Sequence, residues 1–250
     1  MRVVVTLTTI PTRESSVLDT IRSIQSGTYK PDAIRVNLPE WYPRFGRGAD
    51  PDLEEKLKAL GVEVTRCQDY GVLTKLLPTL ETETDPQTLL VVCDDDALYQ
   101  PRWLEGLVKA HEEFGCPVGY SGIAYPETAM KLFGRLGYRL FQGHGTETEM
   151  LECAFGFLIP RWTMIGFPKI PALTADAEKY IYLSDDYLYT KFLDSKGIPK
   201  KVVCWPWAGR RGDDWSTIWV QNPDSQTHAL SRDENNLHNF MMAGLRLKFT

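Results

Sequence analysis

Cysteine and histidine are scarce in this sequence. Its 250 residues include five cysteines and four histidines. The cysteines are scattered without a CxxC spacing, which argues against both a cysteine-ligated zinc site and a disulfide framework. We therefore expect reduced thiols in a cytoplasmic protein. The five are Cys67, Cys93, Cys116, Cys153 and Cys204.

A strong charge of either sign and a long apolar run are also missing. The formal net charge of -5 arises from 28 basic and 33 acidic residues, so the balance gives no general attraction to nucleic acid or anionic membranes. No apolar stretch has the ~20 residues that a membrane-spanning helix needs. The N-terminal residues show neither the apolar region nor the cleavage site of a signal peptide. We expect no nucleic-acid partner and no membrane span.

Short β-branched runs alternate with helical patterns along the first half of the chain. The clearest helix is expected over 50–61, where Asp50 caps, Pro51 occupies the first position and Gly61 ends the helix. Further helices are expected over 17–26, 73–80, 101–114 and 184–196, and Pro78 should either kink or shorten the second of these. Strands are expected over 3–7, 33–38, 62–65, 88–93, 118–123 and 153–159.

This alternation predicts an α/β fold: one Rossmann-like domain with a mostly parallel central sheet flanked by helices. The run 88–93 is apolar on both faces, as expected for a central strand of a parallel sheet. Such sheets bind ligands beyond the C-terminal ends of their strands. The segment 134–149 lacks periodicity, so we expect a long functional loop there. No repeat, low-complexity tract or linker is found, which favours one domain over 1–250.

Three adjacent carboxylates, Asp94, Asp95 and Asp96, follow that apolar strand directly. Three ionised carboxylates at one strand end repel one another unless a cation offsets their charge. A hard divalent ion with oxygen ligands would do so, and such ions also bind substrate phosphates. Because alternate residues of a strand point in opposite directions, Asp94 and Asp96 can converge. An acidic turn on the surface is the alternative interpretation.

The residues around this triplet resemble the DXD segment of GT-A-fold glycosyltransferases, in particular the inverting family-2-like enzymes. The similarity lies in 92–104, where the apolar strand, the acidic triplet, Tyr-x-Pro and Trp-Leu follow in order. The segment 8–13 is similar to that family's nucleotide-binding strand and loop. Asp69-Tyr70-Gly71, with Lys75 after it, is similar to a segment placed beside the nucleotide.

The resemblance implies a GT-A fold, a uridine- or guanosine-type diphosphate sugar donor, with a UDP-sugar favoured, and Mn2+ or Mg2+ as cofactor. It implies that Asp96 holds the metal, that Asp94 holds the donor ribose, and that Asp95 serves either role. Lys75 and Arg13 would add positive charge near the phosphates, although a lysine on a solvated helix face explains Lys75 equally well. Thr8 and Asp69 would also contact the donor.

A second acidic pair, Asp185 and Asp186, opens the helix expected over 184–196. Ser184 as N-cap and carboxylates in the first turn give a purely structural explanation. Inverting transfer, however, needs a carboxylate that takes the proton of the acceptor hydroxyl. The resembling enzymes carry an acidic pair at the start of a helix at this distance, which favours Asp186 as the base and leaves Asp185 as the alternative. The halves 1–115 and 116–250 would then bind the donor and the acceptor.

The C-terminal region combines tryptophan, glycine and arginine over 204–215. Tryptophan stacks on sugar rings and arginine pairs with phosphate, so a loop that closes over a substrate is one interpretation and a core edge with a solvated turn is the other. His228 lies at a suitable distance along the chain to be an additional metal ligand, as some GT-A enzymes have. A surface-loop histidine is the simpler alternative.

Two other functions share some of these features. A metal-dependent phosphohydrolase or nucleotidyltransferase also clusters aspartates at strand ends. The first strand here ends in Thr8-Thr9-Ile10 without an acidic motif, however, and no Gly-rich basic loop follows it. A non-catalytic module that binds sugar nucleotides or glycans would explain the triplet and the tryptophans but would leave Asp186 without a task. The sequence therefore favours a glycosyltransferase that acts on a hydroxyl acceptor.

Overall fold

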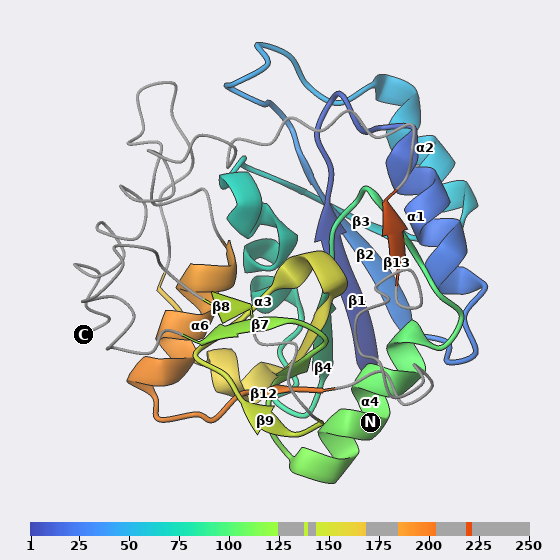
Figure 1. Cartoon of the computed structure of the whole chain (residues 1–250). Helices are drawn as coiled ribbons and strands as arrows, with labels where there is room; N and C mark the ends of the chain where they lie inside the picture. The colour runs from blue at the N-terminus through green and yellow to red at the C-terminus, as the bar shows by residue number, and fades with distance from the viewer. Residues whose placement is uncertain (125–137, 140–143, 169–184, 204–218, 222–250) are drawn as a thin grey trace.

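The computed structural model describes residues 1–124, 138–139, 144–168, 185–203 and 219–221. Its main element is an eight-stranded sheet in the order β3-β2-β1-β4-β11-β6-β12-β9 (Figure 1). Strands β3, β2, β1 and β4 are parallel to one another, and β11 then runs antiparallel to β4 and β6. The eight strands are β1 (Val3–Thr8), β2 (Ala33–Pro39), β3 (Glu63–Cys67), β4 (Leu89–Val92), β6 (Val118–Gly119), β9 (Thr146–Glu147), β11 (Phe157–Pro160) and β12 (Lys201–Val202).

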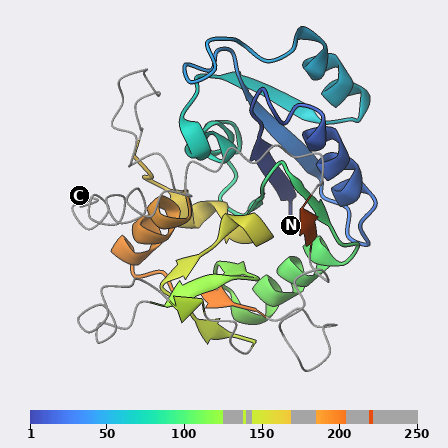
Figure 2. The same cartoon turned by 45° about the horizontal axis from the view of Figure 1, so that its top comes forward.

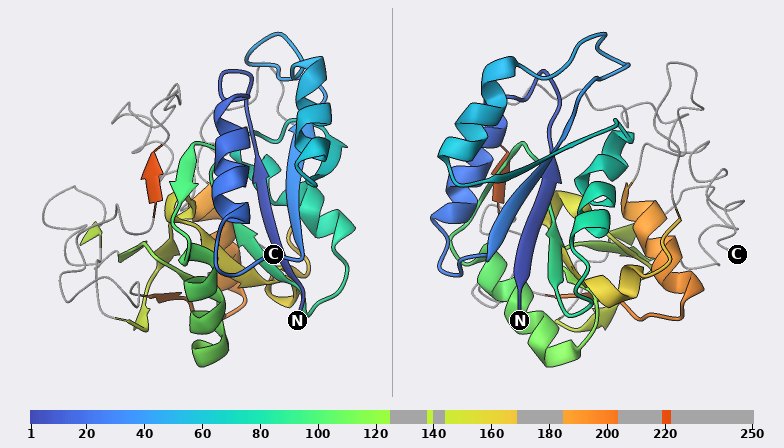
Figure 3. Two further views of the ribbon diagram at one scale, coloured as in Figure 1. Left: turned by 90° about the vertical axis from the view of Figure 1, so that its right-hand side faces the viewer. Right: turned by 180° about the vertical axis from the view of Figure 1, so that it is seen from behind.

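Helices cover both faces of this sheet because its strands are apolar on both sides. Val3, Val5 and Leu7 of β1 belong to the core formed with α1, α2 and α4, whereas Val4 belongs to the core formed with α3 and α6. Figure 3 shows α1 and α3 on opposite faces. The helices are α1 (Ser16–Gln25), α2 (Pro51–Ala59), α3 (Leu77–Thr82), α4 (Trp103–Phe114) and α6 (Asp185–Ser195), with 3-10 turns η1 (Gly71–Lys75), η2 (Cys153–Phe155) and η3 (Arg161–Met164).

The remaining described strands form two smaller sheets. Strands β10 (Met150–Leu151), β7 (Gly122–Ala124) and β8 (Tyr138–Arg139) form one, and β13 (Trp219–Gln221) with β5 (Ala97–Tyr99) forms the other. In the part of the chain that the structure describes, no helix is both long and apolar enough to cross a bilayer.

The chain order creates a switch point between β1 and β4. From β1 the chain proceeds to β2 and β3 on one side, and it then returns to the other side of β1 to form β4. Ligands of open α/β sheets bind at such a point, beyond the C-terminal strand ends. Figure 2, in which this edge comes forward, shows the N-terminal helices α1 and α2 on one side of the molecule and α6 on the other.

Most elements expected from the sequence are confirmed, and α2 is the clearest case. Its N-cap Asp50 accepts a hydrogen bond from the backbone N–H of Asp52 at 2.8 Å, and Leu53 and Leu57 are buried. Of the two effects expected of Pro78, a kink or a shorter helix, the structure shows the shorter helix. The turn η1 ends at Lys75 and α3 begins at Leu77, so Pro78 lies in the first turn, where its missing N–H costs no helical hydrogen bond.

Three further expectations need correction. The strand over 153–159 begins only at Phe157, because Gly156 has φ +80° and packs so closely on Trp103 that a Cβ would lie 2.4 Å from the ring. The strand over 118–123 divides into β6 and β7, which belong to different sheets. The segment 134–149 is not wholly loop, because its described residues include β8 and β9.

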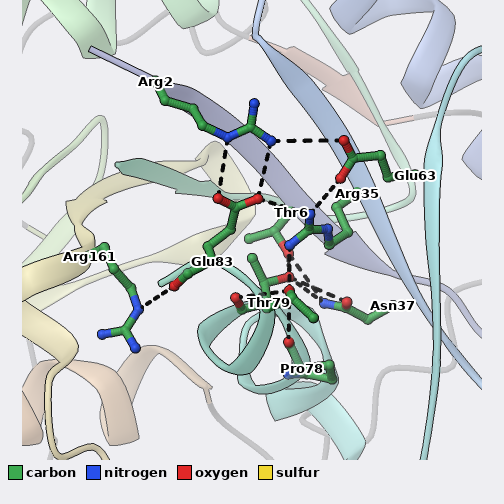
Figure 4. Close-up of polar contacts among 10 residues, drawn as sticks. Arg2, Thr6, Arg35, Asn37, Glu63, Pro78, Thr79, Glu83 and Arg161 are labelled. Carbon is green, nitrogen blue, oxygen red and sulfur yellow. Dashed lines mark hydrogen bonds and ion pairs between the residues drawn. The ribbon is translucent and has the colours of Figure 1, made fainter. Parts of the chain in front are cut away.

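A partly buried ion-pair cluster stabilises the sheet end opposite the switch point (Figure 4). Glu83 accepts two hydrogen bonds from Arg2, both at 3.2 Å, and one from Arg35 at 2.8 Å. The guanidinium of Arg161 donates to the backbone carbonyls of Glu83 and Leu80, both at 2.9 Å. The cluster thereby connects β1, β2, the end of α3 and η3.

We expect Glu83→Gln to lower the free energy of unfolding by about 3 kcal/mol at pH 7, because it removes the buried carboxylate between Arg2 and Arg35 and leaves the buried Arg35 paired only with the more exposed Glu63. Urea denaturation measures this change. Burial raises the pKa of Glu83, but Arg2 and Arg35 outweigh it and the net pKa is lowered. The stability that ionised Glu83 contributes is therefore fully present above the ordinary glutamate pKa and is lost as the pH falls through the lowered pKa.

The control is Glu55→Gln, because the Glu55 side chain is 80% exposed and its ion pair is at the surface. We expect a change within about 0.5 kcal/mol for this variant. Equal effects of the two substitutions at pH 7 would contradict the importance of the cluster.

Candidate functional site

The acidic triplet lies at the switch point, in the short connection from β4 to β5. The hydroxyl of Tyr99 accepts a hydrogen bond from the backbone N–H of Asp94 at 3.1 Å. Tyr99 is in turn stacked on Trp103, with ring centroids 4.1 Å apart. Both aromatic side chains are almost completely buried. The connection that carries the carboxylates is therefore held in place by the core.

Asp95, the middle residue of the triplet, points into the protein. It is 4% exposed, and its two carboxylate oxygens accept hydrogen bonds from Thr9 at 2.7 Å and Arg13 at 2.9 Å. Its backbone carbonyl accepts from Thr20 at 2.9 Å. Burial raises the pKa of Asp95 to about 6, although Arg13 counteracts this effect. These contacts fasten the triplet to the loop after β1 and to α1.

Arg13 connects Asp95 with Asp96. Its second guanidinium nitrogen lies 3.2 Å from a carboxylate oxygen of Asp96. Burial alone would lower the pKa of Arg13, but Asp95 and Asp96 outweigh it and the net pKa is raised. The sequence predicted that the side chains of Asp94 and Asp96 can converge, whereas the structure pairs them with different basic side chains, Lys75 and Arg13.

Asp94 is paired with Lys75, which comes from η1. The ammonium group of Lys75 forms ion pairs with Asp94 and, at 2.9 Å, with Asp185 at the start of α6. The side chain of Lys75 is 13% exposed and that of Asp185 is 8% exposed. The triplet and the second acidic pair lie far apart in the sequence, and the ammonium group of Lys75 forms an ion pair with one residue of each.

Asp186 lies beside Asp185 and is the more accessible of the two. It is half-buried, whereas Asp185 is buried. One carboxylate oxygen of Asp186 accepts a hydrogen bond from the backbone N–H of Cys153 at 2.6 Å. Burial and the neighbouring Asp185 raise the pKa of Asp186 far above the ordinary aspartate value, against the effects of Cys153 and Lys75. A carboxyl group with a raised pKa is suited to general-base catalysis near neutral pH.

Cys153 is a site residue that sequence reasoning missed. Its sulfur and carboxylate oxygens of Asp185 and Asp186 all lie within 4.8 Å of one another. Burial and the two carboxylates raise the pKa of the thiol. No local pattern in the sequence indicates this proximity, because it arises when η2 packs against the start of α6. The four described cysteines are free thiols, as expected, and Cys204 lies outside the described residues.

Asp69 offers a buried acceptor at the C-terminal edge of the sheet, just after β3. One of its oxygens accepts from the backbone N–H of Gly71 at 2.8 Å, and the other has no hydrogen-bond partner among the described residues. Asp69 is 5% exposed, and burial raises its pKa. An unsatisfied buried oxygen of this kind fits a ligand that donates a hydrogen bond.

The other predicted site residues have different surroundings. The hydroxyl of Thr8 donates to the backbone carbonyl of Asn37 at 2.7 Å, so it joins β1 to β2. His228 and the segment 204–215 lie outside the described residues, as does Ser184. Of the other histidines, His111 contacts the carbonyl of Cys116 and His144 contacts Glu113, both at 2.9 Å, as structural residues do.

The charge balance of the site fits a bound divalent cation. Five acidic side chains gather around two basic ones, Lys75 and Arg13, so five negative charges face two positive charges when all are ionised. The ligands on offer are carboxylate oxygens, which Mg2+ and Mn2+ favour. The acidic residues are Asp94, Asp95, Asp96, Asp185 and Asp186.

Comparison with known proteins gives structural similarity without sequence similarity. No protein-family model and no curated protein sequence matches the chain. Among solved structures, 151 chains match. S. aureus TarS (residues 1–349), in complex with UDP-GlcNAc, is 12% identical with a TM-score of 0.59, and the alignment covers 92% of this chain and 61% of TarS.

Two further matches were solved with a nucleotide sugar and Mn2+. A mannosyltransferase from Pyrobaculum calidifontis, with GDP-Man, is 15% identical with a TM-score of 0.51, and 80% of this chain aligns with 54% of that one. Glucosyl-3-phosphoglycerate synthase from Mycobacterium tuberculosis, with UDP-glucose and phosphoglyceric acid, is 17% identical with a TM-score of 0.50 and coverages of 77% and 65%.

This chain aligns with less than two thirds of the length of each of these three proteins. Their sequence identities are low, so the similarity establishes the fold and not the substrates. The α/β fold predicted from the strand–helix alternation and the GT-A fold implied by the family resemblance are both confirmed: the chain has the GT-A-type fold of glycosyltransferases.

Proposed function

We propose that the chain is a metal-dependent glycosyltransferase that moves a sugar from a nucleoside-diphosphate sugar, first of all a UDP-sugar, to a hydroxyl acceptor with inversion. The observation that carries this proposal is the meeting of the acidic triplet with Asp185 and Asp186 at the switch point of a GT-A-type sheet. A donor site and a general base must lie side by side for transfer, and the ion pairs of Lys75 with Asp94 and Asp185 bring these segments together.

In this proposal the donor is bound by residues of 1–115. Asp96 would hold Mn2+ or Mg2+, with His228 as an additional candidate ligand, and the bound ion would offset the negative charge that builds up on the diphosphate. Asp94 would accept hydrogen bonds from the ribose hydroxyls. The unsatisfied oxygen of Asp69 would accept the imide N–H of a uracil base, which favours a UDP-sugar.

Asp95, Thr8 and Arg13 would support the donor site from behind. The hydroxyl of Thr8 and both oxygens of Asp95 are already engaged by protein groups. Arg13 pairs with both Asp95 and Asp96. These residues therefore orient the triplet, and the direct contacts to the donor come from their neighbours.

The region 116–250 would supply the acceptor site and the base. Asp186 takes the proton from the acceptor hydroxyl while the acceptor oxygen bonds to the anomeric carbon and the bond from that carbon to the diphosphate breaks. The proton ends on Asp186 and the nucleoside diphosphate leaves with the bonding electrons. A single displacement of this kind inverts the anomeric centre, by analogy with inverting glycoside hydrolysis. Asp186 is favoured over Asp185 because Asp185 is buried in an ion pair.

Donor binding is tested by the melting temperature of the protein with UDP, UDP-sugars and GDP, each with and without Mn2+. At 100 times its dissociation constant, a ligand stabilises the folded state by about 2.7 kcal/mol. We expect this stabilisation for a UDP compound with Mn2+, and its loss in Asp96→Asn.

The matched control is Asp52→Asn, whose carboxylate is exposed on α2; it should respond like the wild type. If a UDP compound with Mn2+ stabilised Asp96→Asn as much as the wild type, Asp96 would not be the metal ligand. Release of inorganic phosphate would indicate a phosphohydrolase, and binding without transfer to any acceptor would indicate a binding module.

The base assignment is tested by Asp186→Asn. We expect the transfer rate to fall by about 10²- to 10⁴-fold, because the acceptor proton loses its acceptor, while donor affinity stays unchanged. Transfer is followed by release of the nucleoside diphosphate. The exposed Asp52→Asn again serves as the control and should retain the wild-type rate. Wild-type turnover by Asp186→Asn would show that another group is the base.

The pH dependence of kcat provides a third prediction. Asp186 acts as a base when it is ionised, and burial together with Asp185 raises its pKa. Activity should therefore rise with pH through a value well above the ordinary aspartate pKa of ~4. A rate that stays constant down to pH ~4 would contradict this prediction.

A further inference from the structure

Lys75 connects the two acidic segments of the site in a way that its sequence position does not reveal. Its ammonium group is paired with Asp94, from the connection after β4, and with Asp185, from the start of α6. All three side chains are mostly buried. An ammonium group held by two carboxylates has little capacity left to bind a phosphate, which is the role that the sequence suggested.

The backbone of Lys75 is fixed as firmly as its side chain. Its carbonyl oxygen accepts hydrogen bonds from the hydroxyl of Thr6 on β1 at 2.6 Å and from the amide of Asn37 on β2 at 3.1 Å. The carbonyl of Leu73, in the same turn, accepts from the hydroxyl of Tyr189 on α6 at 3.2 Å. The turn η1 is therefore attached both to the central sheet and to the helix that carries the proposed base.

We propose that Lys75 is a positioning residue of the transfer reaction: its ammonium group holds Asp94 and Asp185 together and leaves Asp186 as the carboxylate that takes the acceptor proton. This inference rests on the proposed function. It assigns different tasks to two adjacent aspartates, and it makes the geometry of the base depend on the segment that binds the donor.

The surroundings of Asp186 explain why the lysine matters for the base. Asp185 and Tyr189 face Asp186 from its own helix, Cys153 faces it from η2, and Lys75 acts on it from η1. Burial and Asp185 raise the pKa of Asp186, whereas Cys153 and Lys75 lower it. Without the positive charge of Lys75, the repulsion between the carboxylates of Asp185 and Asp186 is no longer offset. The pKa of Asp186 therefore rises further, and the base is protonated at a higher pH.

Lys75→Met tests the proposal through the pH profile of kcat. The acid limb is the pH range in which kcat rises as the base ionises. We expect it to move to higher pH by about one unit or more, so that kcat at a pH below this range falls about tenfold or more and recovers at alkaline pH. Lys75→Arg, which retains the positive charge, should keep the limb near its wild-type position. If kcat fell by the same factor at all pH values and the acid limb kept its position, Lys75 would have only a structural role and the proposal would be overturned.

A matched control is available in the same protein. Lys200 is 4% exposed and is also ion-paired, with Asp194 at the far end of α6. Lys200→Met removes a lysine that is even more buried than Lys75 but lies outside the proposed site, so the acid limb should not move. A shift of the same size in this variant would show that the effect is a general consequence of losing a buried charge.

A double-mutant cycle tests whether Lys75 acts through Asp185. In an Asp185→Asn background, Lys75→Met should shift the acid limb much less than in the wild type, because the carboxylate that the lysine holds is gone. Equal shifts in the two backgrounds would show that Lys75 acts on another group, such as the donor phosphates, and would overturn the proposal.

A measurement without turnover separates this inference from the proposed function. In the wild-type protein labelled with 13C at the aspartate carboxyl groups, the Asp186 signal should titrate well above the ordinary aspartate range, and Lys75→Met should move this titration to still higher pH. Asp186→Asn assigns the signal. If Lys75→Met leaves the titration of Asp186 unmoved, the proposal fails even when transfer is observed. If no donor supports transfer but the titration moves as stated, the proposed function fails and the coupling stands.

Discussion

The arrangement of the site depends on a buried ammonium group shared by two carboxylates. Lys75 reaches Asp94 on one side and Asp185 on the other, and its own backbone is bound to β1 and β2. An isolated charge in this position would be very costly, and so would either aspartate without its partner. The three groups therefore fix one another, and with them the start of α6 relative to the end of β4.

The sheet supplies the constraint that makes this meeting possible. The chain leaves β1 on one side, returns on the other as β4, and thereby places the loop after β1 and the acidic triplet at the same edge. Arg13 from the first loop pairs with Asp95 and Asp96 of the second. Asp94 instead pairs with Lys75, so the triplet is divided between two basic side chains.

The sequence predicted the elements whose signals are local. The apolar run before the triplet became β4, and the cap at Asp50 became the start of α2, because hydrophobic pattern and capping act over a few residues. Where tertiary contacts decide, the prediction failed: Gly156 packs on Trp103 and interrupts an apolar run that reads as one strand. The partners of Asp95, the bridge through Lys75 and the position of Cys153 also depend on contacts between distant segments, which no local pattern encodes.

The central claim is that the triplet and Asp186 form the two sides of one metal-dependent transfer site. The most direct measurement is a crystal structure with a UDP-sugar and Mn2+, in which the anomalous signal of manganese locates the ion. The account predicts an anomalous peak at Asp96, with the diphosphate beside it and the sugar facing Asp186. A peak among Cys153, Asp185 and Asp186, or a nucleotide bound away from the triplet, would contradict it.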